Sequence, residues 1–419
     1  MGGGGVMRCP ASAGGGPAHH LHEVPAPVRA AIAALDRPVS AYLYDPAVAA
    51  RRAGALRSCL PPWADLLYAV KANSFPPVLE ALASVVDGFE VASAAEADQA
   101  RRAAHGAGRP FRAVASGPAK AAPLLRQLVE AGVEVVNVES RLELARVAAL
   151  GRERGAPVPI ALRVNPGAVD VCGALAMGGG ASPFGIPEEE VPAVLDEARR
   201  LTGVDVVGFH VHAVSGNLDA RAHAAYVRWC LEWSGATAAR SGVDLRVVDA
   251  GGGLGVAFGG GPAFDLDAFA DGLAAVEPPA GCRLVVEPGR WLVADCGWYA
   301  AEVVDLKRVR GSVFAVVRGG INHFLLPASW DLLHRFAVVP LGGWPHGVAR
   351  PEAAGEPVTV VGELCTPEDV LVRDVRVERL RAGDVAVFPR AGAYGWEFAI
   401  PRFLQHPEAP RLVCPAPGQ

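Results

Sequence analysis

Lys71 is the residue whose position most strongly suggests chemistry, because it ends the apolar run 66–70. The composition of this run is typical of a buried strand. An amine at the end of such a strand is costly to keep charged, and a neutral amine can condense with an aldehyde. A lysine can also extend from a strand end to the surface without any chemical role. The segment alone leaves both interpretations open.

Other polar residues end apolar runs or stand directly after them. They are Glu90, Ser116, Glu139, Arg163, His212 with Ser215, Gly251, Gly252, Gly253 and Glu287. Three consecutive glycines allow backbone N–H groups to converge on an anion such as a phosphate, although a tight turn explains them as well. An ionised carboxylate at Glu287 needs a cationic partner, because the run that it ends is apolar.

Two histidines, His210 and His212, lie two residues apart in one predicted strand. We interpret them as facing opposite sides of this strand, so that one of them enters the site. That arrangement disfavours a metal ion shared by both, and a buried structural histidine is the alternative for either. The eight cysteines include no Cys-x-x-Cys pair, so they predict neither a zinc site nor a compact disulfide framework. No metal is expected.

The elements that must position these residues alternate between β-branched runs and helical stretches. Strands are predicted at 65–71, 88–92, 112–116, 134–138, 159–164, 206–212, 245–249 and 283–287, with helices between them, for example at 94–104, 140–154, 187–200 and 220–240. Eight such units predict an α/β fold, the TIM (β/α)8 barrel, whose chemistry lies at the carboxyl ends of its strands. A doubly wound sheet is the competing fold, but no early Gly-x-Gly-x-x-Gly supports it.

After about residue 295 the pattern changes to short β-like runs separated by glycine and proline. These runs lie at 300–309, 312–318, 357–361, 369–376 and 384–388, and they predict a second, C-terminal β domain. The early run 41–44 is assigned to the same domain. The predicted organisation is a disordered leader at 1–20, a segment at 21–45 joining the β domain, a barrel at 46–294 and the β domain at 295–419.

The composition narrows the class of protein. The chain of 419 residues is 51% hydrophobic and 20% charged, with a net charge of −5, which is typical of a globular enzyme. No basic cluster suggests nucleic acid or an anionic membrane surface as a partner, so a small molecule is the expected ligand. The apolar runs are too short to span a membrane and the glycine-rich start does not resemble a signal peptide, so a cytoplasmic protein is expected.

Six short motifs carry a family resemblance. They are Tyr68-Ala69-Val70-Lys71-Ala72-Asn73, Gly208-Phe209-His210-Val211-His212, Asp249-Ala250-Gly251-Gly252-Gly253, Glu287-Pro288-Gly289-Arg290, Gly362-Glu363-Leu364-Cys365 and Ala391-Gly392-Ala393-Tyr394-Gly395. In this order, over almost everything after residue 36, the chain resembles the pyridoxal-phosphate decarboxylases of the ornithine/diaminopimelate group, which have the alanine-racemase-like barrel. Alanine racemases resemble it less, since they place an arginine where Glu287 stands.

The resemblance implies a role for each of these residues. Lys71 would bind the cofactor covalently and Glu90 would belong to the same site, while His212 would lie against one face of the pyridine ring and Arg163 near its phenolic oxygen. Ser215, Gly251, Gly252, Gly253 and Tyr394 would hold the phosphate. Glu287 would keep the ring nitrogen protonated, and a protonated ring accepts the electrons that remain when carbon dioxide leaves.

Cys365 would return a proton to the α-carbon in the active site of the neighbouring subunit, a role that needs a partly exposed thiol. The flanking Gly362 and Thr366-Pro367 predict a loop, whereas a buried apolar cysteine is the alternative. A thiol that acts across a subunit boundary requires a homodimer.

The resemblance also bears on the substrate. Relatives that act on free diamino acids usually carry an acidic residue directly after this cysteine, where this chain has Thr366, and proline stands in 182–185 where a lysine is common. The segments 212–219 and 365–371 look most like the branch that serves siderophore and other secondary pathways. In that branch the amino acid is conjugated, for instance to citrate. Carboxylates on such a substrate could be bound by Arg290 or Arg390.

The leading hypothesis is therefore a decarboxylase of a conjugated amino acid. A decarboxylase of a free diamino acid, such as diaminopimelate or D-ornithine/D-lysine, is the first alternative. A non-catalytic regulatory homologue is the second, although retention of Lys71, His212, Glu287, Cys365 and Tyr394 argues against it.

Overall fold

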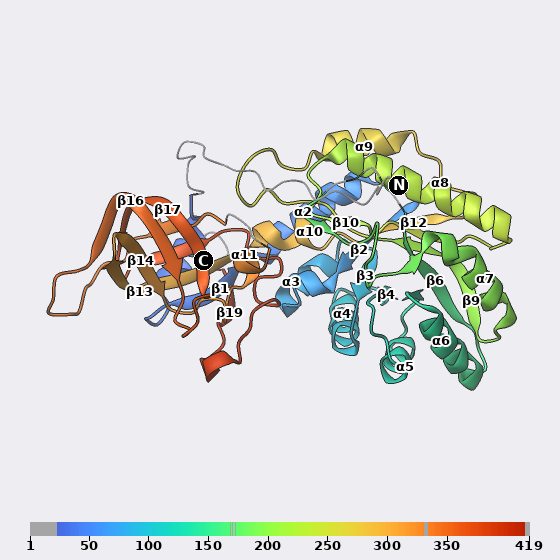
Figure 1. The fold of residues 1–419 in the computed structure, drawn as a ribbon, viewed down its shortest axis with the longest axis horizontal. Helices are drawn as coiled ribbons and strands as arrows, with labels where there is room; N and C mark the ends of the chain where they lie inside the picture. The colour runs from blue at the N-terminus through green and yellow to red at the C-terminus, as the bar shows by residue number, and fades with distance from the viewer. Residues whose placement is uncertain (1–22, 168, 170, 172, 331–333, 415–419) are drawn as a thin grey trace. The chain divides into compact units, whose positions relative to one another are not determined.

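The structure is a computed structural model, and it describes residues 23–414 except 168, 170, 172 and 331–333. The leader predicted at 1–20 lies outside the described residues. The chain divides into two compact units, whose elements are drawn in Figure 1. The first unit comprises Ala50–Ala257 and Pro262–Leu292; the second comprises the described residues before Ala50, Phe258–Gly261 and those from Val293 on.

Eight parallel strands of the first unit close into a barrel, which confirms the predicted TIM (β/α)8 fold. In order around the barrel they are β2 (Ala64–Ala69), β3 (Gly88–Val91), β4 (Ala113–Ala115), β5 (Val135–Val138), β6 (Val158–Asn165), β9 (Val204–Val211), β11 (Val247–Asp249) and β12 (Arg283–Val286), which pairs again with β2. The short β8 (Ile186–Pro187) extends the sheet from β6, and β7 (Leu175–Ala176) pairs with β10 (Val214–Ser215). Each predicted barrel strand is present, and its ends differ from the predicted ones by at most two residues.

Helices follow the strands and form the outer layer of the barrel (Figure 1). They are α3 (Pro76–Ala83), α4 (Ala94–Gly106), α5 (Ala122–Glu130), α6 (Arg141–Arg154), α7 (Val191–Arg200), α8 (Ala220–Ser241) and α9 (Leu266–Ala274), with α2 (Pro46–Cys59) before the first strand. The four-residue α10 (Arg290–Val293) follows the last barrel strand, and the division of the chain into units falls within it. The helix predicted at 187–200 begins later, because residues Glu188–Glu190 form a 3-10 turn, η2. Two further 3-10 turns are η1 (Val70–Ala72) and η3 (Ala294–Cys296).

Two of these helices begin with the same local device, a serine cap followed three residues later by glutamate. Ser93 accepts a hydrogen bond from the Glu96 N–H, and the Glu96 carboxylate accepts one from Ala92 N–H. Ser140 and Glu143 repeat this pattern with Glu139. This arrangement, a capping box, provides hydrogen-bond acceptors for N–H groups that have no partner within the first helical turn. It therefore fixes the backbone just where a barrel strand gives way to its helix.

The second unit is built mainly of β structure. Its sheet contains β15 (Ala337–Val339), β18 (Val385–Phe388), β13 (Gly297–Val309), β14 (Ser312–Val317), β16 (Glu352–Val361) and β17 (Val370–Arg381) in that order, with β1 (Ser40–Tyr44) on β13 and β19 (Arg411–Val413) on β1. The helices α1 (Ala26–Ala33) and α11 (Leu326–Ser329) and the turn η4 (Phe403–Gln405) complete it. The three-residue strands β15 and β19 are absent from the sequence-based expectation.

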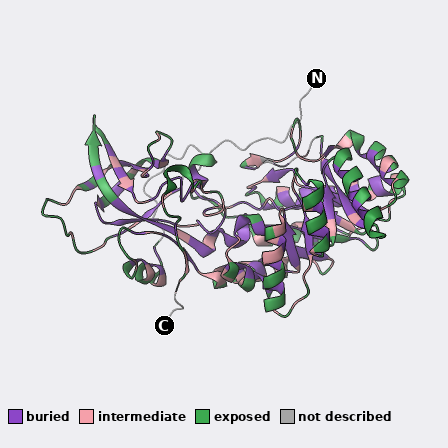
Figure 2. Cartoon of the chain, turned by 90° about the horizontal axis from the view of Figure 1, so that it is seen from below, coloured by how far each residue is buried: buried purple, intermediate pink, exposed green. Residues whose placement is uncertain are grey.

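Burial follows the strands, which are mostly purple in Figure 2. All six residues of β2 are buried, so this strand reads as a continuous apolar run apart from Asp65. Asp65 lies at the amino end of the strand, where Arg283 and Arg112 donate to its carboxylate and lower its pKa against the opposing effect of burial. The charge of this buried carboxylate is therefore paired within the protein.

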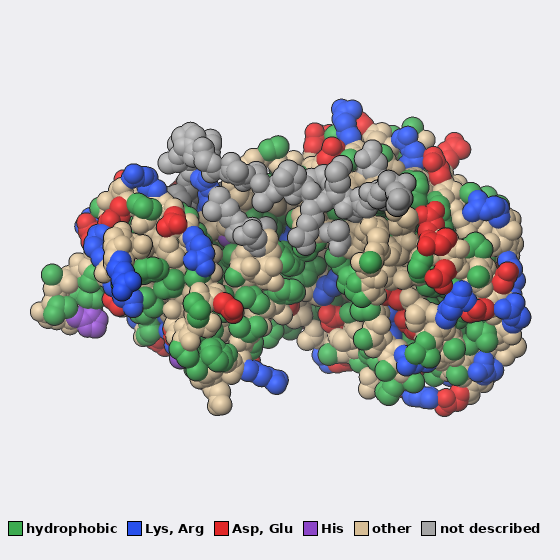
Figure 3. Space-filling model, viewed as in Figure 1, with side chains coloured by type: hydrophobic (Ala, Val, Ile, Leu, Met, Phe, Trp, Pro, Cys, Tyr) green, Lys and Arg blue, Asp and Glu red, His purple; other side chains and the backbone are tan. Residues whose placement is uncertain are grey.

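Charged side chains of both signs are interspersed on the face of the barrel unit seen in Figure 3. No helix in the described part of the chain combines the length and the apolarity needed to cross a bilayer.

Gly208 on β9 packs closely against the neighbouring barrel strand. A Cβ atom at Gly208 would overlap the carbonyl oxygen of Val247 on the paired strand β11. We expect Gly208→Ala to lower the free energy of unfolding by about 1–3 kcal/mol, because a strand must shift to admit the methyl group. Gly54→Ala on α2 is the matched control, since no atom outside the adjoining helix backbone lies within 4 Å of its Cβ position. Urea unfolding that gave both variants the same change would contradict this packing.

Candidate functional site

Lys71 lies in η1, two residues beyond the end of the strand β2. Its Nζ donates to Glu90 Oε2 at 2.6 Å, and the register of β2 with β3 places Ala69 opposite Glu90. The Glu90 side chain is buried, whereas 45% of the Lys71 side chain is exposed. The amine is therefore accessible from solvent while a buried carboxylate fixes its direction. The burial inferred from sequence is only partial, because the chain turns at the end of the strand.

Arg163 is held in place by two neighbours. Its Nη1 donates to Glu139 Oε1 at 2.8 Å, both groups being buried, and its guanidinium lies 4.8 Å from the centre of the Phe184 ring. Glu139 also accepts from the N–H groups of Gly117 and Gly185, at 3.0 and 3.2 Å. A guanidinium with a carboxylate on one side and an aromatic face on the other has little freedom to rotate.

Lys120 adds a second buried charge beside this network. Its Nζ lies 2.8 Å from Glu143 Oε1 and 4.0 Å from Glu139 Oε1. Burial raises the pKa of the Glu143 carboxyl, while the Lys120 charge opposes that effect. The sequence pattern predicts no role for Lys120. In the structure it supports the carboxylate that holds Arg163.

Both histidines face the inside of the barrel, which corrects the interpretation that they face opposite sides. His210 Nε2 lies 3.8 Å from Glu287 Oε2, and His212 Nδ1 accepts from the N–H of Gly252 at 3.3 Å. The reason is that residues two apart on a strand share a face. Burial, and next the Arg163 charge, lowers the pKa of each ring well below its ordinary value. Neutral imidazoles are therefore favoured at both positions.

Glu287 stands one residue after β12 and is buried. One carboxylate oxygen of Glu287, one of Asp249 and one ring nitrogen of His210 all lie within 4.8 Å of one another. Burial raises the pKa of the Glu287 carboxyl well above its ordinary value, and the Asp249 charge adds to this. Burial also raises the pKa of Asp249. In the described chain Glu287 Oε1 has no hydrogen-bond partner, so an acceptor position stays open here.

Asp249 is a site residue that the sequence pattern did not single out. It ends β11, and its two oxygens accept from Gly251 N–H at 2.8 Å and Asn137 Nδ2 at 3.3 Å. The Asn137 amide also donates to Ser116 Oγ at 3.0 Å. One bonded chain thus links the ends of three strands. Its sequence signal is a carboxylate that closes a buried strand and stands two residues before the glycine triplet.

The glycine triplet packs closely against these groups. A Cβ at Gly251 would overlap His212, one at Gly252 would overlap the Glu287 carbonyl oxygen, and one at Gly253 would lie 2.9 Å from the Val214 carbonyl oxygen. Gly251 and Gly253 have φ of 67° and 107°, which disfavour other residues. The N–H groups of Gly251 and Gly252 already donate within the protein. Close packing is thus one requirement for glycine here, and phosphate binding stays a prediction.

Arg290 is buried at the start of α10, and its Nη2 lies 3.5 Å from Ser215 Oγ. The resemblance implies separate tasks for the two residues, Ser215 for the phosphate and Arg290 for the substrate. The structure places them side by side. Together with Lys71, Glu90, Arg163, His212, the triplet and Glu287, they occupy the carboxyl end of the barrel strands.

The remaining predicted residues belong to the second unit. Cys365 lies in the loop between β16 and β17, and it is the one exposed residue among the described cysteines. Thr366 follows it. Arg390 donates through Nε to Asp295 Oδ1 at 3.1 Å, and Tyr394 has a φ of 56° with its ring 5.2 Å from that of Trp330.

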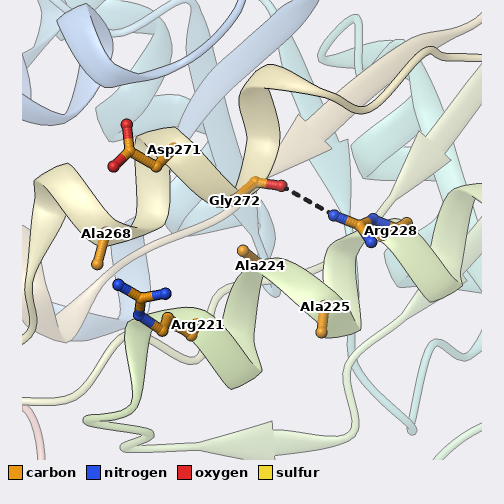
Figure 4. Close-up of a pocket in the computed structure, with 7 residues that line it drawn as sticks. All are labelled: Arg221, Ala224, Ala225, Arg228, Ala268, Asp271 and Gly272. Atoms are coloured by element: carbon orange, nitrogen blue, oxygen red, sulfur yellow. Dashed lines mark hydrogen bonds between the residues drawn. The ribbon is translucent and has the colours of Figure 1, made fainter.

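A separate hollow of about 270 Å³ opens between α8 and α9 (Figure 4). Alanines and the charged residues Arg221, Arg228 and Asp271 line it, and Arg228 Nη2 donates to the Gly272 carbonyl at 3.3 Å. It lies between helices of the outer layer and contains none of the predicted site residues.

Comparisons with known proteins agree with this geometry. Residues 48–294 match the family described as pyridoxal-dependent decarboxylase, pyridoxal binding domain. The chain is 34% identical to 2-[(L-alanin-3-ylcarbamoyl)methyl]-2-hydroxybutanedioate decarboxylase of Staphylococcus aureus, over 91% of this chain and 95% of that protein. It is 30% identical to an L-glutamyl-[BtrI acyl-carrier protein] decarboxylase of Niallia circulans, over 87% and 86%. Diaminopimelate decarboxylase from Helicobacter pylori, solved with L-lysine, superposes with a TM-score of 0.77 at 25% identity, over 90% of this chain and 92% of that one.

Proposed function

The chain belongs to the pyridoxal-dependent decarboxylase family, and from this premise we propose that it removes the α-carboxylate of a conjugated amino acid, such as one linked to citrate. The enzyme class and the cofactor, pyridoxal 5'-phosphate, follow from the family. The substrate and the role of each residue are our proposal. The observation that carries the choice of substrate is the similarity, over nearly the whole chain, to a relative whose own substrate is a citrate-like conjugate.

The described residues fit the cofactor at its reactive and charged positions. Pyridoxal phosphate, when bound, supplies an electron sink for the carbon that loses carbon dioxide. Lys71 offers an accessible amine beside Glu90. Glu287 Oε1 offers a buried acceptor without a partner in the described chain, which suits a ring N–H donor. The buried Asp249 carboxyl beside it increases the preference for a cation at this point.

We also propose the remaining cofactor contacts. Ser215 would hold the phosphate with the glycine triplet and Tyr394, and we add Arg290, because its guanidinium already lies against Ser215. His212 would cover one face of the ring, kept neutral by burial. Arg163, fixed by Glu139 and Phe184, would meet the phenolic oxygen.

Substrate selection is assigned to the second unit. Thr366 is neutral where relatives that act on free diamino acids usually carry an acid, so a distal ammonium would find no partner there. Arg390, oriented by its bond to Asp295, is the arginine that we assign to a substrate carboxylate. Loss of a matching charge at a recognition site typically rejects the unmatched substrate strongly.

Carbon dioxide release from a panel of amino acids tests this proposal. With added pyridoxal phosphate, we expect kcat/KM for the citrate-linked amino acid to exceed those for meso-diaminopimelate, D-ornithine, D-lysine, L-ornithine and L-lysine at least tenfold, which corresponds to about 1.4 kcal/mol in the transition state. A preference for a free diamino acid would support the first alternative, which the similarity to diaminopimelate decarboxylase also favours. Purified protein that neither binds the cofactor nor releases carbon dioxide would instead support a regulatory homologue.

We further propose a cytoplasmic homodimer with shared active sites, in which Cys365 of one subunit returns the proton beside Lys71 of the other. Mixing inactive Lys71→Ala with inactive Cys365→Ala protein should then restore about a quarter of wild-type activity. Half of the dimers are mixed at equal amounts, and each mixed dimer holds one intact site of two. Subunit exchange, verified by native mass spectrometry, without any recovered activity would place both residues in one chain.

A further inference from the structure

We propose that Asp369 is the positioning residue of Cys365: its buried carboxylate closes the loop 362–369 and so fixes the thiol at the tip of that loop. This inference deepens the proposed function and rests on the proposed role of Cys365. The loop joins β16 to β17, two antiparallel neighbours in the sheet of the second unit (Figure 1).

The carboxylate bonds to two separate segments. Asp369 Oδ2 accepts from the N–H of Leu364 at 2.8 Å, and Leu364 directly precedes Cys365. Asp369 Oδ1 accepts from the N–H of Ile321 at 2.7 Å, in the turn after β14. One buried side chain, 2% exposed, therefore ties the thiol-bearing loop to a segment more than 40 residues earlier.

The backbone of the loop is closed at the same residue. Gly362 N–H donates to the Asp369 carbonyl at 3.1 Å, and Asp369 N–H donates to the Thr366 carbonyl at 3.2 Å. Cys365 thus lies inside a ring of bonds that begins and ends at Asp369. Loops closed in this way have fewer conformations than open ones of equal length.

Two glycines leave room for the carboxylate and for nothing larger. A Cβ at Gly320 or at Gly362 would overlap the oxygens of Asp369. Gly320 has a φ of 154°, which is open to glycine and unfavourable for other residues. Gly320 and Gly362 therefore fit closely around the Asp369 carboxylate. An aspartate that only faced solvent would not require glycine at these positions.

A second attachment keeps the same segments together. Glu363 N–H donates to the Gly319 carbonyl at 2.9 Å, Gly319 N–H donates to Glu363 Oε1 at 3.1 Å, and Arg318 pairs with the Glu363 carboxylate. With both ends of the 362–364 segment fixed, the exposed Cys365 can be mobile in its side chain while its Cα stays in place.

The proposed proton transfer from Cys365 requires a thiol that is held in one place. After carbon dioxide leaves, the Cys365 S–H bond breaks, a C–H bond forms at the α-carbon, and the thiolate takes a proton back from solvent. A donor held on one side of that carbon delivers the proton to one face only. A donor on a loose loop delivers it more slowly and loses the facial preference.

Asp369→Asn tests the clamp in the intact enzyme loaded with pyridoxal phosphate. An amide cannot accept at both positions, so the Leu364 and Ile321 amides should exchange with deuterium at least about tenfold faster than in the wild type. With the citrate-linked amino acid in deuterated water, or meso-diaminopimelate if that is the substrate, the single-turnover burst of carbon dioxide should persist. Amine formation should slow about tenfold, and deuterium should appear on both faces.

The matched control is Asp374→Asn. Asp374 is an exposed aspartate on β17 whose carboxylate accepts from Thr359 Oγ1 at 3.4 Å, and the control should match the wild type throughout. If the Leu364 and Ile321 amides of Asp369→Asn exchange faster while amine formation keeps its wild-type rate and deuterium appears on one face only, the positioning role is overturned. If Cys365→Ala itself keeps the wild-type rate and stereochemistry, the proposed role of the thiol fails instead. Should Asp369→Asn not fold, wild-type Leu364 and Ile321 amides that exchange without protection would overturn the clamp.

Discussion

Lys71→Ala is expected to lower kcat for decarboxylation by at least about 10³, a larger loss than that expected from any other single substitution in the site. The reason is that the Lys71 amine is exposed and directed by Glu90, whereas the Lys120 amine is buried in ion pairs. No neighbouring group can replace a covalent attachment. Steady-state assays at saturating pyridoxal phosphate measure kcat, and the visible absorbance of the dialysed protein measures retained cofactor.

Lys307→Ala is the matched control, since Lys307 is an exposed lysine on β13 of the second unit. It should keep wild-type kcat and absorbance. Lys71→Ala protein that keeps its activity would refute the assignment of the amine.

Glu287→Gln is expected to lower kcat by about 10² to 10³ while weakening cofactor affinity by no more than about tenfold. The amide keeps the shape of the side chain but removes the carboxylate that would stabilise a protonated ring nitrogen. The position is buried beside Asp249 and His210, so no solvent replaces the lost charge. Titration with pyridoxal phosphate gives the affinity, and single-turnover carbon dioxide release gives the chemical rate.

The matched control here is Glu277→Gln, at an exposed glutamate before β12. Both parameters should stay at their wild-type values in this variant. A Glu287→Gln enzyme with wild-type turnover at saturating cofactor would show that the ring nitrogen does not depend on this carboxylate.

The barrel could be predicted because each of its strands is an apolar run separated from the next by a helical pattern. Barrel closure then brings the strand ends together, so that Lys71, Arg163 and Glu287 could be grouped from their positions alone. The three-residue strands β15 and β19 could not be predicted because they stand outside the βα alternation that marks the equally short barrel strands β4 and β11.

The links between strands could not be predicted either. The chain from Ser116 through Asn137 to Asp249 depends on which side chains meet inside the closed barrel, and sequence separation of up to 112 residues hides that meeting. The same holds for Asp369, whose partner Ile321 is 48 residues away. The error over His210 and His212 was a misapplied rule and not a lack of information. Side chains alternate along a strand with a period of two, so residues two apart lie on one face.

The most direct test of the central claim is to locate the cofactor on the wild-type chain. The chain contains three lysines, Lys71, Lys120 and Lys307, so the assignment is unambiguous. After incubation with pyridoxal phosphate, borohydride reduction and digestion, mass spectrometry should find the pyridoxyl group on the peptide that contains Lys71. A pyridoxyl group on Lys120 or Lys307, or none on any lysine, would contradict the account.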